Sequence, residues 1–188
     1  AALVAAPLAA RPVTHSMGIT EVPDAPERVV ILTNEGTEAL LALGITPVGA
    51  VSSWLGDPWY PHIAAQMEGV EVVGTESAVN LELIAALEPD LIIGNKQRQE
   101  KEYAQLSAIA PTVLSERLRG DWMVNFALYA EAVGRMDEGR KVMDDFRAEI
   151  EATKAALGSA IDEQVSVIRF LAGQIRIYQK DSFSGVLL

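Results

Sequence analysis

The chain has 188 residues, 49% of them hydrophobic, and its 15 lysines and arginines against 26 aspartates and glutamates give a formal net charge of −11. This length is enough to bury one good core and part of a second, and the negative charge argues against nucleic acid or an anionic membrane surface as a partner. Cysteine is absent, His15 and His62 share no metal-ligand spacing, and no run approaches the roughly 20 apolar residues of a membrane span, so the sequence predicts no disulfide, no metal site and no transmembrane helix.

An alternation of short apolar runs and helical segments begins after residues 1–12, an alanine-rich stretch that we interpret as the tail of a cleaved signal or a disordered leader. A small hairpin is expected over residues 13–22. A buried strand at 28–32, a helix at 35–43 and a second strand at 48–51 then make a βαβ unit. The alternation predicts an α/β fold with a mostly parallel, Rossmann-like sheet.

The loop expected after the second strand carries three aromatic side chains, Trp54, Trp59 and Tyr60. They either pack over the edge of the sheet, as we expect of one of the three, or form a wall for a partly organic ligand. We interpret all three as candidate ligand-binding residues.

The alternation continues to residue 133 and then changes. Residues 136–157 have the apolar stripe of one helix, roughly 30 Å long, which is longer than a helix covering one sheet needs. A hairpin over residues 165–178 and the first turn of a helix at 183–188 follow, and these cannot form a stable lobe, so the sequence is expected to be a fragment. The other expected elements are helices at 63–67, 81–87, 99–110 and 121–133 and strands at 70–73, 91–93 and 112–114.

Positive charge is concentrated in one part of the chain. Residues 29–95 contain no lysine or arginine. Five then follow within 24 residues, namely Lys96, Arg98, Lys101, Arg117 and Arg119. They come just after two predicted strands, at the edge where open α/β sheets bind ligands. We interpret Arg98 and Arg119 as contacts for an anionic ligand; the alternative, local pairs with neighbouring glutamates on a solvated helix, is preferred for Lys101.

Several segments carry a resemblance to a known family. PERVVIL, ALLALGITPVGAV and NLELIAALEPDLIIGN occur in this order before the long helix. In this the chain resembles the helical-backbone class of substrate-binding proteins, which serve ABC importers of ferric siderophores, haem and cobalamin. LIIGNKQRQEKEYAQLSAIAPTV, LRGDW and RFLAGQIRIYQKDSFSGVLL resemble, more narrowly, binders of ferric citrate and of citrate-based hydroxamate or carboxylate siderophores.

The resemblance implies two α/β lobes joined by a rigid helix, with the ligand held between them. Residues 13–135 are then the first lobe, 136–158 the backbone helix and 159–188 the incomplete beginning of the second lobe. The chain departs from the family pattern by lacking nearly all of that lobe. We further expect a monomeric, extracytoplasmic protein, in the periplasm or attached to the membrane as a lipoprotein, that is not an enzyme.

The resemblance also gives roles to particular residues. Arg98 and Arg119 match positions that hold an anionic ferric siderophore, and Lys96 is a weaker candidate. From the second lobe, the residues expected across the cleft are Arg169, Arg176 and Tyr178. Glu82 matches the glutamate that related binders present to the permease; otherwise it is a solvent-facing residue of an exposed helix. The siderophore coordinates the iron fully, so neither a protein metal ligand nor a cofactor is expected.

Two alternatives stay open. A haem or cobalamin binder of the same family is one; a haem site needs an axial tyrosine or histidine, which only Tyr60 and Tyr178 offer in the cleft. An enzyme on a Rossmann-like lobe is the other. Against it, residues 33–36 read Thr-Asn-Glu-Gly where a glycine-rich fingerprint would stand, and no nucleophile paired with a histidine is visible.

Overall fold

The computed structural model describes residues 10–187. Its first unit opens with an antiparallel hairpin of β1 (Ala10–His15) and β2 (Gly18–Pro23). The strand begins three residues inside the stretch expected to be a leader, because Ala10 pairs with Pro23 and Arg11 donates a hydrogen bond to the carbonyl oxygen of Ala132. The rest of the expected leader lies outside the described residues.

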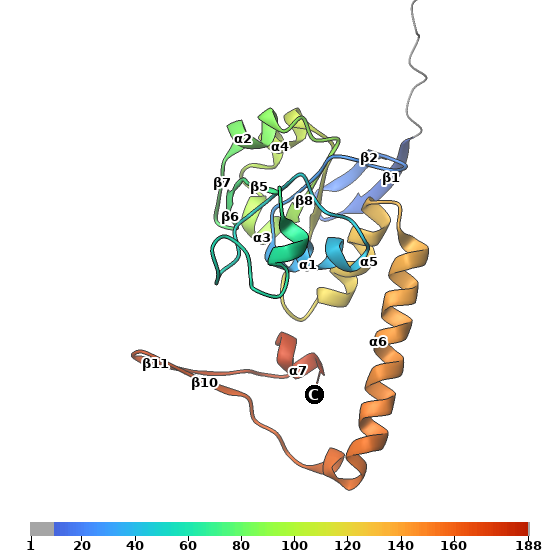
Figure 1. Ribbon diagram of the computed structural model, residues 1–188, viewed down its shortest axis with the longest axis vertical. Helices are drawn as coiled ribbons and strands as arrows, with labels where there is room; N and C mark the ends of the chain where they lie inside the picture. Colours follow the sequence, from blue (N-terminus) through green and yellow to red (C-terminus); the bar gives the residue numbers. More distant parts are fainter. Residues whose placement is uncertain (1–9, 188) are drawn as a thin grey trace, which may run out of the picture.

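A five-stranded parallel sheet forms the centre of this unit (Figure 1), in the strand order β5-β4-β3-β8-β9. The α/β fold with a parallel sheet expected from the sequence is thereby confirmed. The central strands β3, β8 and β9 are short, fully buried runs that contain valine, isoleucine or leucine, as buried parallel strands do. The strands are β3 (Val29–Ile31), β4 (Gly49–Ala50), β5 (Glu71–Val72), β8 (Leu91–Asn95) and β9 (Thr112–Ser115).

Successive side chains of the strands alternate between two cores, one on each face of the sheet. Val29 and Ile31 of β3 belong to one buried cluster, whereas Val30 and Leu32 belong to the other. The first cluster is covered by α1 (Asn34–Ala42) and α5 (Trp122–Ala132), and the second by α2 (Leu81–Ala86) and α4 (Tyr103–Ile109). Between these elements lie η1 (Ala64–Met67) and a small hairpin of β6 (Gly74–Thr75) and β7 (Ala78–Val79).

The helix expected over residues 99–110 is interrupted in the structure. A short helix, α3 (Lys96–Gln99), ends before α4 begins at Tyr103. The interruption follows from Gln99, whose side chain is buried and bonds to the backbone of two other segments. Asn95 ends β8 and caps α3, since its side chain accepts a hydrogen bond from the Gln97 N–H.

The long helix is confirmed as α6 (Met136–Leu157), which runs away from the first unit (Figure 1). After η2 (Gly158–Asp162) the chain turns back. A hairpin of β10 (Ile168–Leu171) and β11 (Gln174–Ile177) leads into α7 (Phe183–Leu187). β10 starts three residues later than the strand expected from residue 165. No helix within residues 10–187 is both long and apolar enough to cross a membrane.

Aromatic side chains connect the returning segment to the first unit. The Trp122 ring of α5 meets Phe146 of α6 edge-on, at 5.3 Å between ring centroids, and Phe183 of α7 at 5.9 Å. A Cβ atom added to Gly120 would lie 2.5 Å from the carbonyl oxygen of Asp181, which shows how closely the two backbones approach. The returning segment is therefore held against the loop that follows β9.

Candidate ligand-binding site

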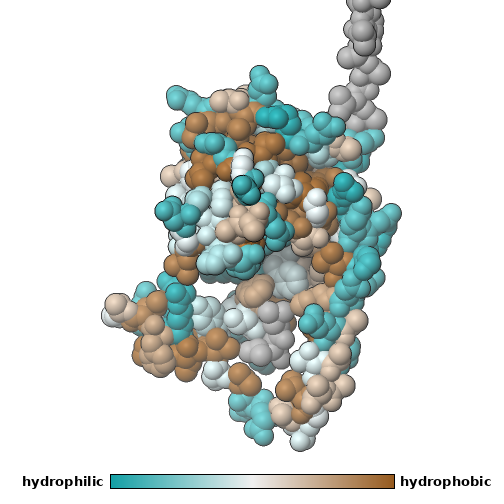
Figure 2. Space-filling view, in the orientation of Figure 1, coloured by the Kyte–Doolittle hydropathy of each residue, from teal (hydrophilic) through white to brown (hydrophobic). Residues whose placement is uncertain are grey.

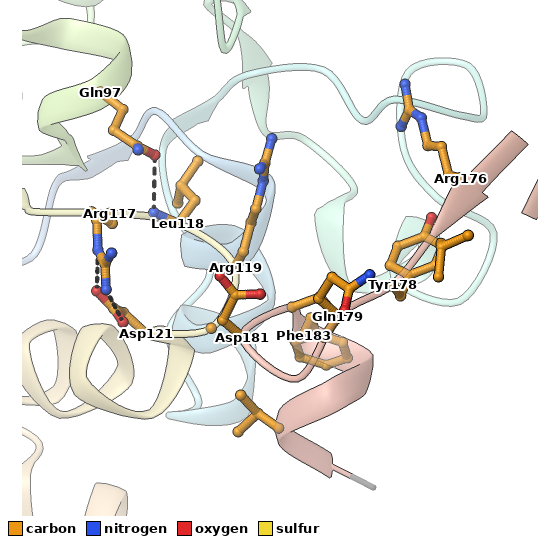
Figure 3. A pocket seen from close by; sticks show the side chains of 14 residues that line it. Gln97, Arg117, Leu118, Arg119, Asp121, Arg176, Tyr178, Gln179, Asp181 and Phe183 are labelled. Carbon is orange, nitrogen blue, oxygen red and sulfur yellow. Dashed lines mark hydrogen bonds and ion pairs between the residues drawn. The ribbon is translucent and has the colours of Figure 1, made fainter. Parts of the chain in front are cut away.

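An open cavity of about 830 Å³ lies where the loop after β9 faces the returning segment (Figure 3). One wall comes from residues 117–121 together with Gln97 of α3, and the other comes from residues 176–186. Three residues predicted to bind ligand, Arg119, Arg176 and Tyr178, line this cavity. It opens at the carboxyl ends of β8 and β9, the edge at which open α/β sheets bind ligands.

Arg119 is exposed and occupies a loop with an unusual backbone conformation. Its φ of +82° lies in the left-handed region, which non-glycine residues seldom adopt. Neighbouring side chains stabilise this loop. Asn125 of α5 donates from Nδ2 to the Arg117 carbonyl oxygen at 2.7 Å and to Glu35 Oε1 at 2.7 Å. The side chain of Arg119 is thus presented by a loop that α1 and α5 hold from behind.

Most other cations at this edge are paired with acids. Lys96 lies 3.3 Å from Glu116, and Arg117 lies 2.9 Å from Asp121. Arg98 lies outside the lining of the cavity, with its Nε 3.5 Å from Oε2 of Glu76. Within residues 10–187, Arg119, Arg169 and Arg176 form no ion pair. The site therefore combines neutralised cations around its rim with unneutralised arginines from both walls.

The two arginines of the hairpin face each other. In the β10–β11 register Arg169 lies directly opposite Arg176, so both side chains extend from the same face. The opposite face carries Ile168, Phe170 and their cross-strand partners, all exposed. Figure 2 shows a hydrophobic surface over the part of the chain that forms the hairpin. Like charges directly opposite on a ladder destabilise it, and an anion between them removes that cost.

The aromatic residues of the loop over residues 52–61 are separate from the cavity. Trp59 is 7% exposed and belongs to the core, so packing accounts for this member of the three. Trp54 is 60% exposed, and Tyr60 stacks on His62 with 5.6 Å between ring centroids. None of the three lines the cavity.

Neither histidine lines the cavity. His62 is exposed and lies 2.8 Å from Glu38. His15 Nδ1 accepts a hydrogen bond from the Leu114 N–H at 3.2 Å, and burial lowers the pKa of His15. Within the described part of the chain, no three histidine, aspartate or glutamate side chains gather closely enough to hold a metal ion.

A network of buried polar side chains underlies the site, and sequence reasoning missed it. Asn95 donates from Nδ2 to Ser115 Oγ at 2.9 Å, and Ser115 Oγ lies 2.9 Å from the Tyr129 hydroxyl. That hydroxyl donates to Glu35 Oε1 at 3.4 Å. A signal was present in the sequence: β8 and β9 end at the polar residues Asn95 and Ser115, and Thr33 comes two residues after β3, all at the edge where open α/β sheets bind ligands.

Burial shifts the pKa of two groups in this network, Glu35 and Tyr129. Burial raises the pKa of Glu35, although hydrogen bonds from Asn125, from the Arg119 backbone and from Tyr129 oppose the shift. Burial, together with the nearby Glu35 carboxylate, also raises the pKa of Tyr129. Tyr129 is thus a neutral hydrogen-bonding group, and Glu35 is an acid whose ionised form is disfavoured.

The remaining predicted residue, Glu82, lies in the first turn of α2, with Asn80 as the N-cap. Its side chain is exposed, and α2 covers the core on the opposite face of the sheet from α1 and α5. The structure does not bring Glu82 together with the cavity.

Comparison with known proteins places this geometry in context. A family model described as periplasmic binding protein matches residues 29–183. A probable siderophore-binding lipoprotein of Bacillus subtilis, YfiY, is 56% identical over 179 residues, which cover 95% of this chain and 55% of the relative. The Fe(3+)-citrate-binding protein YfmC of the same organism is 31% identical over 171 residues, which cover 89% of this chain and 54% of the relative.

Among solved structures, SirA of Staphylococcus aureus complexed with staphyloferrin B superposes with a TM-score of 0.81 at 37% identity. The superposition covers 89% of this chain and 59% of SirA. The chain thus spans about half the length of the curated relatives it matches.

Proposed function

The chain belongs to the periplasmic binding protein family, and we propose that it serves as the extracytoplasmic solute-binding component of an ABC importer that captures a ferric siderophore. The observation that carries the proposal is the cavity with Arg119 on one wall and Arg176 and Tyr178 on the other. Arginines from two different elements converge there without acidic partners among residues 10–187. Such a site suits an anionic ligand of considerable size.

The siderophore class we propose is the citrate-based one, with carboxylate and hydroxamate oxygens. The planar guanidinium group of arginine donates two parallel hydrogen bonds to a carboxylate and stays charged at any relevant pH. The opposed Arg169 and Arg176 supply two such groups side by side. The iron is cargo, coordinated by the oxygens of the siderophore, and the protein recognises the outer surface of the complex.

The relatives support this class of ligand. One is named as a siderophore-binding lipoprotein, another as an Fe(3+)-citrate-binding protein, and the superposed SirA structure holds staphyloferrin B. The arginines that line the cavity suit the anionic ligands that these names mention. We propose that this protein is extracytoplasmic, as a lipoprotein or a periplasmic binding protein is, and that it delivers the ligand to the permease of an importer.

Titration of the full-length protein with ferric siderophores tests the proposal. Its three tryptophans report binding through their fluorescence. We expect saturable quenching with ferric citrate and with ferric citrate-based siderophores, weakened by salt because the attraction is ionic. Absence of quenching by every ferric siderophore, with a Soret band appearing on addition of haem, would instead support a haem binder.

We also propose that Glu82 docks the protein on its permease. Its exposure on α2, away from the cavity, is the supporting observation. Glu82→Ala should leave the affinity for ferric siderophore within about twofold of the parent, because surface substitutions away from a site change little. Uptake by cells that carry the variant should fall. A collapse of affinity would show instead that Glu82 belongs to the binding site or supports it.

A further inference from the structure

Glu76 occupies a position where a buried charge is unexpected. It lies in the two-residue turn between β6 and β7, a place normally filled by exposed side chains. Its neighbours Thr75 and Ser77 are exposed, yet Glu76 is only 5% exposed. A buried carboxylate is costly unless charged and hydrogen-bonding partners compensate it.

The partners of Glu76 come from the two segments that follow β3 and β8. Its Oε1 accepts hydrogen bonds from the backbone N–H of Asn34 at 2.8 Å and from Asn34 Nδ2 at 3.0 Å. The carbonyl oxygen of Glu76 accepts from Gln99 Nε2 at 2.9 Å. Gln99 is itself buried and accepts from the Asn95 N–H at 2.9 Å. Glu76 therefore ties its turn to the start of α1 and to the end of α3.

The second carboxylate oxygen forms an ion pair with Arg98. Oε2 of Glu76 lies 3.5 Å from Arg98 Nε, and the Arg98 side chain remains 37% exposed. Arginine has five N–H donors arranged in a fixed fork, so an acid at Nε leaves the outer Nη groups available. Among residues 10–187, these groups make no hydrogen bond. Arg98 stands next to Gln97, which lines the cavity.

We propose that Glu76 is a positioning residue: its ion pair with Arg98 Nε orients the guanidinium beside the cavity, outside its lining, and leaves the Nη groups of Arg98 for an anionic group of a ligand that extends beyond the cavity. The Asn34 hydrogen bonds fix the carboxylate, and the carboxylate fixes the guanidinium. Arg98 and Glu76 then act as a unit, whereas Arg119 acts alone. The inference rests on the proposed function for the identity of the ligand, but the positioning itself is measurable without one.

A double-mutant cycle measures the coupling, with ferric citrate as the probe. In the parent, Arg98→Ala should weaken binding about tenfold, the effect of losing one charge-assisted hydrogen bond. In a Glu76→Gln background the same substitution should weaken binding less than about twofold, because an unfixed Arg98 contributes little. Equal losses in the two backgrounds would overturn the inference.

A matched control is available in the neighbouring pair of Lys96 and Glu116, whose carboxylate is exposed. Glu116→Gln removes the acid that pairs with Lys96, two residues before Arg98, without touching the Glu76 contacts. The cost of Arg98→Ala in that background should equal its cost in the parent. A reduced cost there would assign the coupling to general electrostatics and contradict a specific role for Glu76.

A second measurement requires no ligand. Hydrogen exchange of the arginine Nε–H groups, followed by NMR, should show Arg98 protected relative to Arg140, an exposed residue of α6 that pairs with Asp137 through Nη2 and not through Nε. Glu76→Gln should remove the protection. If that variant fails to fold, Glu76→Asp is the alternative. It keeps the negative charge, but its shorter side chain moves the carboxylate away from Arg98, so the Arg98 Nε–H should be less protected from exchange.

Arg98 exchanging as fast as Arg140 in the parent would refute the positioning role. If the parent binds no ferric citrate or other siderophore but Arg98 is protected, the proposed function fails while the positioning of Arg98 by Glu76 stands. The two failures are therefore distinguishable.

Discussion

β9 and β10 are both short apolar strands, but their surroundings differ completely. All four residues of β9 are buried, and Val113 is fully enclosed between its neighbours. In β10 three of four residues are exposed, and Phe170 is 75% exposed. Local sequence is sufficient to make both segments extended. Burial depends on neighbours, which β9 receives from β8 and flanking helices, whereas β10 has only β11.

The same contrast holds for charge. In the first unit Lys96, Arg98 and Arg117 are paired with acids, and these pairs leave Arg119 as the cation presented to the cavity. In the hairpin Arg169 and Arg176 oppose each other and form no ion pair within the described residues. The first unit is stabilised by contacts among its own residues. The hairpin instead leaves its hydrophobic side chains and arginines exposed, so that they are available to contact other groups.

The largest expected effect compares one isoleucine from each unit. Ile93 of β8 is fully buried, so Ile93→Ala should lower the free energy of unfolding by about 2–5 kcal/mol. Ile175 of β11 is 63% exposed, and Ile175→Ala should change it by less than about 0.5 kcal/mol. Chemical denaturation measures both. Similar losses would mean that the hairpin is packed as tightly as the sheet.

Arg119 tests the charge contrast directly. Losing its charge-assisted hydrogen bonds, worth about 1.5–3 kcal/mol, should weaken binding of a ferric citrate-type siderophore roughly 10- to 100-fold in Arg119→Ala. Arg119→Lys should lose less, because lysine keeps the charge but not the fork. Lys101→Ala, at an exposed position beyond α3, is the control and should bind like the parent. Parent-like affinity of Arg119→Ala would remove Arg119 from the site.

Two hydroxyl groups at helix starts give a smaller comparison. Thr33 Oγ1 accepts from the Gly36 N–H at 3.0 Å, at the start of α1. Thr33→Ala should therefore cost about 1 kcal/mol of unfolding free energy. Ser182 Oγ accepts from the Gly185 N–H at 3.1 Å, at the start of α7. Because α7 has only five residues and is partly exposed, Ser182→Ala should cost only about a few tenths of a kcal/mol. A larger cost at Ser182 would contradict this ranking.

The smallest expected effect is on pH dependence in the first unit. The raised pKa of Glu35 lies above its ordinary value of 4.5, so between these two values the folded protein holds a proton that the unfolded chain has released. The free energy of unfolding should fall as the pH rises through that window and level off above it. Glu35→Gln cannot ionise and should flatten this slope in denaturation curves. An unchanged slope would assign it to another group.

Much of the fold follows from the sequence because its determinants are local. Runs of valine and isoleucine predict the five strands, Thr33 predicts the start of α1, and the apolar stripe predicts α6. The interruption of the helix before α4 cannot be predicted from the sequence. It depends on a bond between Gln99 and the Glu76 carbonyl oxygen, groups 23 residues apart in sequence. A helical spacing pattern contains no information on such a contact.

The site is predictable to the same limited extent. The position of Arg119 after an apolar strand places it at the edge of the sheet where the cavity opens, and the resemblance adds Arg176 and Tyr178 opposite it. Sequence treats Arg98 and Arg119 alike, however, and the structure separates them. The difference is Glu76, which is distant in sequence and lies against Arg98 only because the β6–β7 turn folds inward.

Iron itself can locate the ligand. A crystal of the protein with a ferric citrate-type siderophore, measured at the iron absorption edge, gives one anomalous peak for each bound iron. The proposed function predicts a peak in the cavity between Arg119 on one wall and Arg176 and Tyr178 on the other. A peak elsewhere, for example beside Trp54 and Tyr60, or no peak in a crystal grown with saturating siderophore, would contradict it.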